Sequence, residues 1–487
     1  MQDLNLSSPR EILNILGQTF EAARSNKDIS CLRKSLDASL KVDLTPFSSQ
    51  EVSTFHYFVS NGWSYMLVLT HTNPEDIPCD SFFYEKEIYH LRCALAHSSL
   101  KKDTHVCEIL TNLGFALSHV GRYAEAQEYF NRALAVNSEF GMALGNKGYG
   151  LYCYARVVHD GAHQFIFLQY ARKLLMEAIA TNNVYEDVRS GFRDLANHIS
   201  TMFPLDELEN FRQYDNSFAA LSNDEVDYRT WCMNNVLFLN PLNDVLSQNV
   251  VAYDFLHTPI MTLKNGEKPI FQSIYNQIKQ EFVSARFLYY EGITNYYNKH
   301  YSDNNVKLYR SFDSPLYSLS VEKVKIAFRM SYSIFDKIAY LLNIYLDLNI
   351  DKNRISFRNI WHEKGNKRNP VNKSIFKKDN WSLQGLYWLS KDLDEGADSP
   401  IEPEAKEIST IRNFIEHKSF KVVLFKNICY SELPETYEIE KYDFYEKTLK
   451  LLKLTRSALL YLSSILYEEE SLKGTLGDVW TVDMEEL

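Results

Sequence analysis

Apolar residues recur at helical spacing along most of the chain, and the pattern differs between its two halves. In the first 50 residues one amphipathic face includes Ile12, Leu16 and Phe20. Shorter segments that pair two by two follow up to about residue 183. The second half instead predicts four long helices, over Phe271–Asn298, Val321–Leu348, Glu404–His417 and Tyr442–Glu468. We therefore expect an all-α protein, with a solenoid of helical hairpins followed by a helical bundle.

The segment Cys107–Ser138 has the residue spacing of one such hairpin. Its small and large apolar positions are Leu110, Leu113, Gly114, Leu117, Ala126, Phe130 and Ala133. Gly and Ala at these spacings let two antiparallel helices approach closely, and the larger residues fill the gaps between them. The segment resembles a tetratricopeptide (TPR) repeat.

Two weaker copies flank this repeat. The later one contains Leu144, Gly148, Leu151, Ala171, Leu175 and Ala178, with about eleven extra residues between its helices relative to the usual period. The earlier, degenerate one contains Phe58, Gly62, Tyr65, Tyr89, Cys93 and Ala96. We predict a TPR-like domain over 1–183, capped by its first 50 residues, a bridging region over 184–265, and a helical bundle over 266–487.

Charge is distributed unevenly along the 487 residues, whose net charge is −11. Residues 1–265 carry 21 Lys and Arg against 31 Asp and Glu, whereas residues 266–487 carry 31 against 32. The acidic balance argues against a general binder of polyanions, and any nucleic-acid site is expected in the second half.

The cysteines and the hydropathy pattern suggest a cellular compartment. Seven scattered Cys without a CxxC pair favour a reduced, intracellular protein without a structural zinc. Neither a signal peptide nor a stretch of ~18 apolar residues is evident. We expect a cytoplasmic protein that needs no cofactor, metal or membrane.

The third long helix carries the residues best suited to chemistry, in the pattern R-N-x-x-x-H: Arg412, Asn413 and His417. Asn413 and His417 lie about 40° apart on an ideal helix. An arginine can grip two phosphate oxygens and stabilise charge in a transition state, and a histidine can move a proton near neutral pH. An asparagine can orient either group, so the three suit cleavage of RNA by its own 2′-hydroxyl.

A helical bundle with this motif on its third helix resembles the HEPN (higher eukaryotes and prokaryotes nucleotide-binding) superfamily of ribonucleases. The resemblance covers about residues 266–470, and TPR repeats upstream are similar to a bacterial TPR-linked subgroup. It implies a metal-independent endoribonuclease that leaves 2′,3′-cyclic phosphate ends, with a composite site in a homodimer or higher homo-oligomer. It also implies an RNA substrate such as tRNA or mRNA, a protein or peptide ligand of the TPR region that gates cleavage, and a role in phage defence or toxin-like growth arrest.

Two simpler interpretations remain open for the motif. Arg412 and Glu416 could form a surface ion pair, with His417 serving only as a helix C-terminal cation. The protein would then be a non-catalytic TPR scaffold, whose degenerate HEPN bundle serves dimerisation or nucleotide or RNA binding.

Three other features upstream of the motif could serve either structure or RNA binding. Arg358–His362 reads R-N-x-x-H, one residue shorter, and we interpret it as a loop-packing or RNA-contacting element. The basic segment that follows could track a phosphate backbone or be a solvated loop, and its cations are Lys364, Lys367, Arg368, Lys373, Lys377 and Lys378. Phe376 or Trp381 could stack on a base. Arg286 and Arg329 are expected to form structural ion pairs, for which Glu291 and Asp336 lie close by in the sequence.

Overall fold

The computed structural model describes residues 8–71, 73, 77–99, 103–214, 218, 221–261, 268–294, 300–309, 315–376, 380–394, 401–425 and 435–473. These residues are largely helical, with one two-stranded sheet, which confirms the predicted all-α class. The chain forms two compact units. The first comprises Met1–Arg156, Asp160–Gln213 and Tyr387–Thr410, and the second comprises Val157–His159, Tyr214–Leu386 and Ile411–Leu487. The domain borders expected at 183 and 265 stay a prediction.

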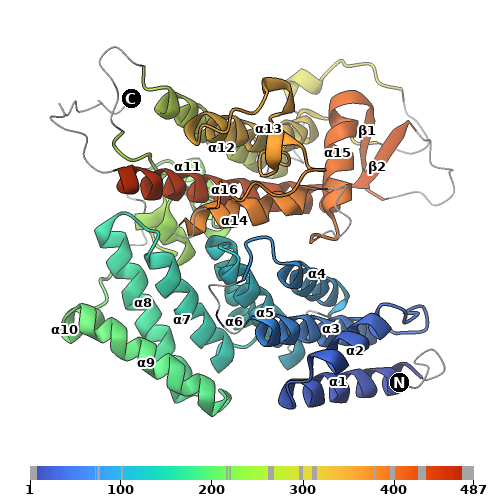
Figure 1. The fold of residues 1–487 in the computed structure, drawn as a ribbon. Helices are drawn as coiled ribbons and strands as arrows, with labels where there is room; N and C mark the ends of the chain where they lie inside the picture. The colour runs from blue at the N-terminus through green and yellow to red at the C-terminus, as the bar shows by residue number, and fades with distance from the viewer. Residues whose placement is uncertain are drawn as a thin grey trace. The chain divides into compact units, whose positions relative to one another are not determined.

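The first unit is a stack of helical hairpins. Its helices are α1 (Pro9–Ser25), α2 (Ile29–Ser39), α3 (Ser49–Thr70), α4 (Phe82–His97), α5 (Thr104–His119), α6 (Tyr123–Val136), α7 (Gly141–Ala155), α8 (Gly161–Ala180), α9 (Glu186–Met202) and α10 (Leu205–Glu209). From α3 to α9 each helix packs against the next one along the chain, as in a solenoid (Figure 1). Helices α1 and α2 pack on α3 and on each other, as expected for a cap.

Close helix approach depends on the small residues that the repeat pattern contains. A Cβ atom at Gly114 of α5 would lie 2.7 Å from Cε1 of Phe130 on α6. At Gly148 of α7 it would lie 2.9 Å from Cγ of Leu175 on α8. Phe130 and Leu175 are fully buried, so they have little room to move. The glycines therefore set the spacing of the helices in both hairpins.

The second unit is built on three long helices, α12 (Ile270–Thr294), α13 (Leu319–Tyr345) and α16 (Lys441–Lys473), which all pack on one another. Helix α11 (Asn223–Asn234) precedes them. Its short 3-10 helices are η3 (Pro241–Asp244), η4 (Asn249–Val251), η5 (Tyr301–Asp303), η6 (Lys352–Arg354) and η7 (Glu363–Gly365), whereas η8 (Lys391–Leu393) belongs to the first unit. Helices α14 (Trp381–Ser390) and α15 (Ala405–His417) each run from one unit into the other. The four long helices predicted from apolar spacing are confirmed within a few residues, and the expected end of the first, 295–298, lies outside the described residues.

Two buried arginines fasten the bridging segment to the bundle helices of the second unit. Arg286 of α12 donates through both terminal nitrogens to Asp254, each at 2.8 Å. Arg456 of α16 donates from Nη1 to Asp244 at 2.8 Å and from Nε to the carbonyl of Phe238 at 2.7 Å. Because an unpaired buried charge is costly, these pairs hold residues 238–254 in one position on the bundle.

The structural role expected for Arg286 is confirmed, but its expected partner was wrong. Glu291 lies five residues along the same helix and instead accepts from Lys323 of α13 at 3.0 Å. Asp254, in the bridging segment, forms the pair because its carboxylate faces both guanidinium nitrogens.

A small sheet follows α15 and was absent from the sequence prediction. Strands β1 (Ser419–Val423) and β2 (Thr436–Glu440) pair in parallel, with Ser419 opposite Thr436. Phe420 and Val422 are buried on one face of β1 and Val423 is buried on the other, while Ser419 is exposed. Both strands contact α16, and the sheet therefore continues the bundle directly after the motif helix.

Replacing Gly114 with alanine tests whether glycine sets the α5–α6 spacing. The added methyl group overlaps the buried ring of Phe130, and we expect Gly114→Ala to lower the free energy of unfolding by about 1–3 kcal/mol. Gly191 of α9 is the matched control, because a Cβ there meets no atom within 4 Å. Gly191→Ala should raise the free energy of unfolding by about 0.5–1 kcal/mol. Urea denaturation followed by circular dichroism measures both, and equal stability of the two variants would contradict the packing.

Candidate functional site

Helix α15 brings the three motif residues to its last two turns. Ala405, Ile408 and Ile411 are buried and anchor the helix along one side. Arg412, Asn413, Phe414 and Ile415 are half-buried, whereas Glu416 and His417 are exposed. Helix α15 ends at His417, and strand β1 begins two residues later. None of the three motif side chains is enclosed in the apolar core, so the motif can be reached from solvent.

Arg412 is held by two contacts within the second unit. Its Nη1 donates to Oδ1 of Asn413 at 3.1 Å. Its guanidinium carbon also lies 5.5 Å from the centre of the Tyr332 ring on α13, a cation–π distance. The aromatic face and the carboxamide together restrict where the guanidinium can point. Two of the three predicted residues are thus brought into direct contact.

Glu416 pairs with α13 rather than with Arg412. Arg329 donates from Nε to Oε1 of Glu416 at 2.9 Å and from Nη2 to Oε2 at 3.2 Å. The surface pair between Arg412 and Glu416, considered above, is therefore wrong for the described chain. The partner expected for Arg329 was also wrong, because Asp336 accepts instead from the backbone N–H of Phe357 at 3.0 Å. The Arg329–Glu416 pair leaves the guanidinium of Arg412 available to a ligand on its remaining edge.

His417 is the last residue of α15, one helical turn after Asn413. Phe414, between them, faces β2, where its ring centre lies 5.6 Å from that of Tyr437. Within the described residues, hydrogen bonding joins Arg412 to Asn413 but does not include His417. The imidazole is therefore presented to solvent beside an arginine–asparagine pair that is already ordered.

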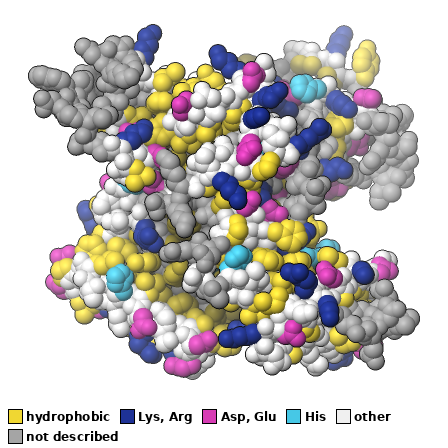
Figure 2. Space-filling model, in the orientation of Figure 1, with side chains coloured by type: hydrophobic (Ala, Val, Ile, Leu, Met, Phe, Trp, Pro, Cys, Tyr) yellow, Lys and Arg dark blue, Asp and Glu magenta, His cyan; other side chains and the backbone are white. Residues whose placement is uncertain are grey.

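The basic segment before α14 forms a loop that is closed by a backbone hydrogen bond and carries exposed cations. Lys364, Lys367, Arg368 and Lys373 are exposed, while Lys377 and Lys378 lie outside the described residues. The N–H of Glu363 donates to the carbonyl of Pro370 at 3.0 Å, which closes the loop at its base. Gly365 has φ of +61°, and a Cβ there would lie 2.4 Å from Ile350. On the face drawn in Figure 2, Lys and Arg side chains are interspersed with Asp and Glu side chains.

The shorter R-N-x-x-H sequence packs its own loop. Trp361 is buried and donates from Nε1 to the carbonyl of Phe357 at 2.7 Å. His362 bonds through Nδ1 with the carbonyl of Asn369 at 3.0 Å. Phe376 stacks on Trp361, with ring centres 6.3 Å apart, so one of its faces is covered. These contacts agree with the loop-packing interpretation of Arg358–His362.

Sequence reasoning missed Tyr332, which packs against Arg412, and it named Arg329 as a structural ion-pair former without finding its partner Glu416. Tyr332 and Arg329 lie on α13, about 80 residues before Arg412 in the chain. The signal that could have indicated them is their spacing, since residues three apart on α13 share a face that can meet one side of α15.

Outside the motif, the carboxyl groups of the buried Glu87 and the half-buried Glu468 have a raised pKa. Burial raises the pKa of Glu87 on α4 to about 8 and that of Glu468 on α16 to about 7. Ser382 donates to Oε1 of Glu468 at 3.1 Å. Such shifts accompany functional sites as well as structural ones, and neither group contacts the motif helix among the described interactions.

The described residues include neither a metal-binding cluster nor a membrane-spanning helix. No cluster of three or more His, Cys, Asp or Glu side chains is arranged there to bind a metal ion. Within the same ranges, none of the helices combines the length and apolar content needed to cross a bilayer.

Comparison with known families agrees with this architecture. Residues 262–469 match the family model of the LA2681-like HEPN domain, and residues 107–140 match that of the tetratricopeptide repeat. No curated protein and no solved structure matches the chain. The HEPN match includes α12, α13, α15 and most of α16, and the repeat match begins within α5 and includes α6. The chain therefore combines a tetratricopeptide repeat with a LA2681-like HEPN domain.

Proposed function

We propose that this protein is a metal-independent endoribonuclease whose site is built from Arg412, Asn413 and His417. The observation that carries the proposal is their placement on the last two turns of α15, with Arg412 ordered by Asn413 and Tyr332 and with His417 exposed. HEPN domains are usually ribonucleases, which supports this class of activity.

The reaction we propose uses the nucleophile that RNA carries. The ribose 2′-oxygen bonds to the adjacent phosphorus, the bond from phosphorus to the 5′-oxygen breaks, and the products are a 2′,3′-cyclic phosphate and a 5′-hydroxyl. Arg412 stabilises the charge that accumulates on the phosphoryl oxygens. His417 transfers a proton from the 2′-hydroxyl or to the leaving 5′-oxygen. Asn413 orients the guanidinium.

A second protomer would complete this site. A single His417 cannot contact both the attacking 2′-oxygen and the leaving 5′-oxygen while Arg412 of the same helix contacts the phosphoryl oxygens. Two copies of α15 paired about a two-fold axis supply an imidazole for each proton transfer. We therefore propose a homodimer, with tRNA or mRNA bound across the pair. The exposed cations Lys364, Lys367, Arg368 and Lys373 would contact its phosphates.

The TPR region would hold a protein or peptide ligand and gate the cleavage, and the biological outcome would be phage defence or growth arrest.

The alternative function, a non-catalytic scaffold that dimerises or binds RNA, is favoured by one observation. Arg412 already has two partners in its own protomer.

Removing the imidazole of His417 should stop cleavage and leave the fold intact. General acid–base groups contribute about 10²- to 10⁴-fold to a rate, so we expect His417→Ala to lose activity by that factor. The assay incubates total tRNA with purified protein in EDTA and maps the new ends. His97→Ala is the matched control, because His97 is likewise an exposed histidine in the last turn of its helix. Full cleavage by His417→Ala would refute its assignment.

Removing the guanidinium of Arg412 should relieve growth arrest caused by overexpression. Loss of one donor to the transition state costs about 10²- to 10³-fold in rate. Viable counts after induction compare Arg412→Ala with wild type and with Arg193→Ala, which alters an exposed arginine of α9. Arrest that persists in Arg412→Ala would separate toxicity from the proposed site.

Neutralising the exposed cations of the basic segment should weaken RNA binding without abolishing it. We replace Lys364, Lys367, Arg368 and Lys373 with glutamine together. If each contacts one phosphate of a single strand, the slope of log affinity against log salt becomes shallower by about 3. The control replaces four exposed cations of the first unit, Lys27, Arg33, Lys34 and Lys41. A slope unchanged in the first variant would show a solvated loop.

A further inference from the structure

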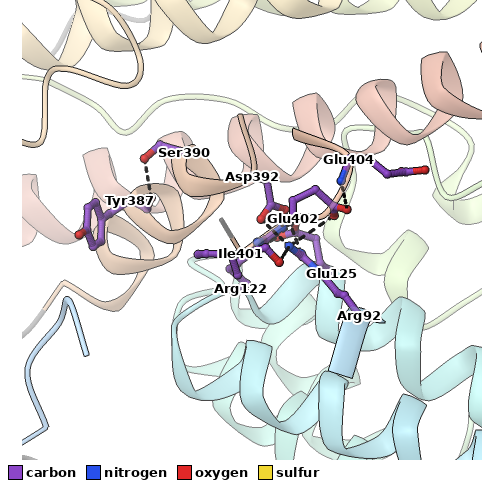
Figure 3. A network of polar contacts seen from close by, with 9 residues as sticks. All are labelled: Arg92, Arg122, Glu125, Tyr387, Ser390, Asp392, Ile401, Glu402 and Glu404. Atoms are coloured by element: carbon purple, nitrogen blue, oxygen red, sulfur yellow. Dashed lines mark hydrogen bonds and ion pairs between the residues drawn. The ribbon is translucent and has the colours of Figure 1, made fainter. Parts of the chain in front are cut away.

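A buried charge cluster of the first unit joins the TPR helices to a segment that precedes the motif helix. Asp392 lies between two guanidinium groups (Figure 3). Arg92 of α4 reaches its two oxygens at 2.7 and 3.0 Å, and Nη2 of Arg122, at the start of α6, reaches Oδ2 at 2.6 Å. The three side chains are 7%, 1% and 1% exposed for Arg92, Arg122 and Asp392. One carboxylate thus fixes the separation of two TPR helices.

Arg92 extends this network of polar contacts to the start of α15. Nη1 of Arg92 donates to the carbonyl of Ile401 at 3.2 Å and lies 3.4 Å from Oε2 of Glu402. The other oxygen of Glu402 accepts from the N–H of Glu404 at 3.2 Å. The carbonyl of Glu402 accepts from the N–H of Ala405, where α15 begins. A continuous chain of polar contacts therefore leads from α4 and α6 to the start of the motif helix.

Further contacts bind this segment to the α4 hairpin. Trp388 donates from Nε1 to the carbonyl of Cys79 at 2.7 Å, and its ring meets Tyr84 edge-on at 6.3 Å. Lys391 pairs with Glu85 of α4. Residues 387–410 belong by sequence to the range matched by the HEPN family, yet they fold with the TPR helices.

The charge of Asp392 makes its ion pairs with Arg92 and Arg122 sensitive to small movements of α4 and α6. Burial by itself would raise the pKa of Asp392, but Arg122 and Arg92 hold it well below its ordinary value. The carboxylate is therefore charged, and a buried charge keeps its partners only at short distance and good angle. If α4 and α6 separate, Asp392 cannot satisfy both arginines, and its segment must move with one of them.

We propose that Asp392 is a positioning residue that makes the starting position of α15 depend on the spacing of α4 and α6. Where it concerns cleavage, this inference rests on the function proposed above. A protein or peptide ligand that alters that spacing then acts on the motif through the helix itself. The 13 residues of α15 span about 20 Å at 1.5 Å per residue, so a tilt of about 5° at its start moves His417 by about 2 Å. A misplacement of 1 Å can cost about 10²-fold in rate.

Hydrogen exchange in the full chain tests the coupling without reference to activity. Asp392→Asn keeps the shape and removes the charge. We expect amides of α15, residues 405–417, to exchange at least tenfold faster than in wild type, and those of α4 and α6 to accelerate as well, because coupling is reciprocal. Arg92→Lys, which retains the charge but loses the two-pronged contact, should give a smaller change and keeps the test valid if Asp392→Asn folds poorly.

A destabilising variant elsewhere in the same unit is the control. In Gly145→Ala the new Cβ overlaps Phe192 of α9, away from the network, and exchange in α15 should stay at the wild-type rate. If Gly145→Ala accelerates α15 as much as Asp392→Asn does, or if Asp392→Asn leaves α15 unchanged, the inference is overturned.

Cleavage of tRNA in the same preparations separates the two proposals. We expect Asp392→Asn to cleave at least tenfold more slowly than Gly145→Ala. Faster exchange in α15 with no cleavage by wild type would retain the coupling and reject the nuclease. Cleavage by wild type with an unaltered Asp392→Asn would retain the nuclease and reject the coupling.

Discussion

The need to pair every buried charge organises both units of this protein. Arg286 and Arg456 find their carboxylates in the bridging segment, and Arg92 finds Asp392 in the segment before α15. In each case the arginine lies on an α-helix and its partner lies in a loop or a short 3-10 helix. Apolar packing alone would leave such stretches several alternative positions, whereas a two-pronged guanidinium contact accepts only one. The ion pairs therefore fix the positions of these segments, as apolar packing fixes the positions of the helices.

The helices could be predicted from the sequence because the apolar spacing that marks the buried face of a helix repeats over a short stretch of chain. The apolar spacing of α12, α13 and α16 and the Gly–Phe pairing of α5 with α6 each repeat within a few turns, so neighbouring residues are sufficient evidence. The motif could be placed on α15 for the same reason. The strands β1 and β2 were not predicted, because each has only five residues and neither alternates clearly between buried and exposed positions.

The ionic partners could not be predicted, because they are set by the fold rather than by proximity along the chain. Arg92 and Asp392 are 300 residues apart, and Arg329 meets Glu416 across 87. Nearby acids such as Glu291 and Asp336 were reasonable candidates by sequence, yet each is used elsewhere. Tyr332, which orders Arg412, has no distinguishing mark among 32 tyrosines until the two helices are placed together.

Residues 387–410 also bear on how such proteins can diversify. They are encoded inside the HEPN range but complete the fold of the repeat region, so the border between the two parts in sequence is not the border in space. Replacing the repeat region by another, with the join placed between the two family matches, would separate Asp392 from Arg92 and Arg122, and Trp388 from the carbonyl of Cys79. A chimera of this chain must therefore carry residues 387–410 together with the repeat region, or rebuild the contact with a new one.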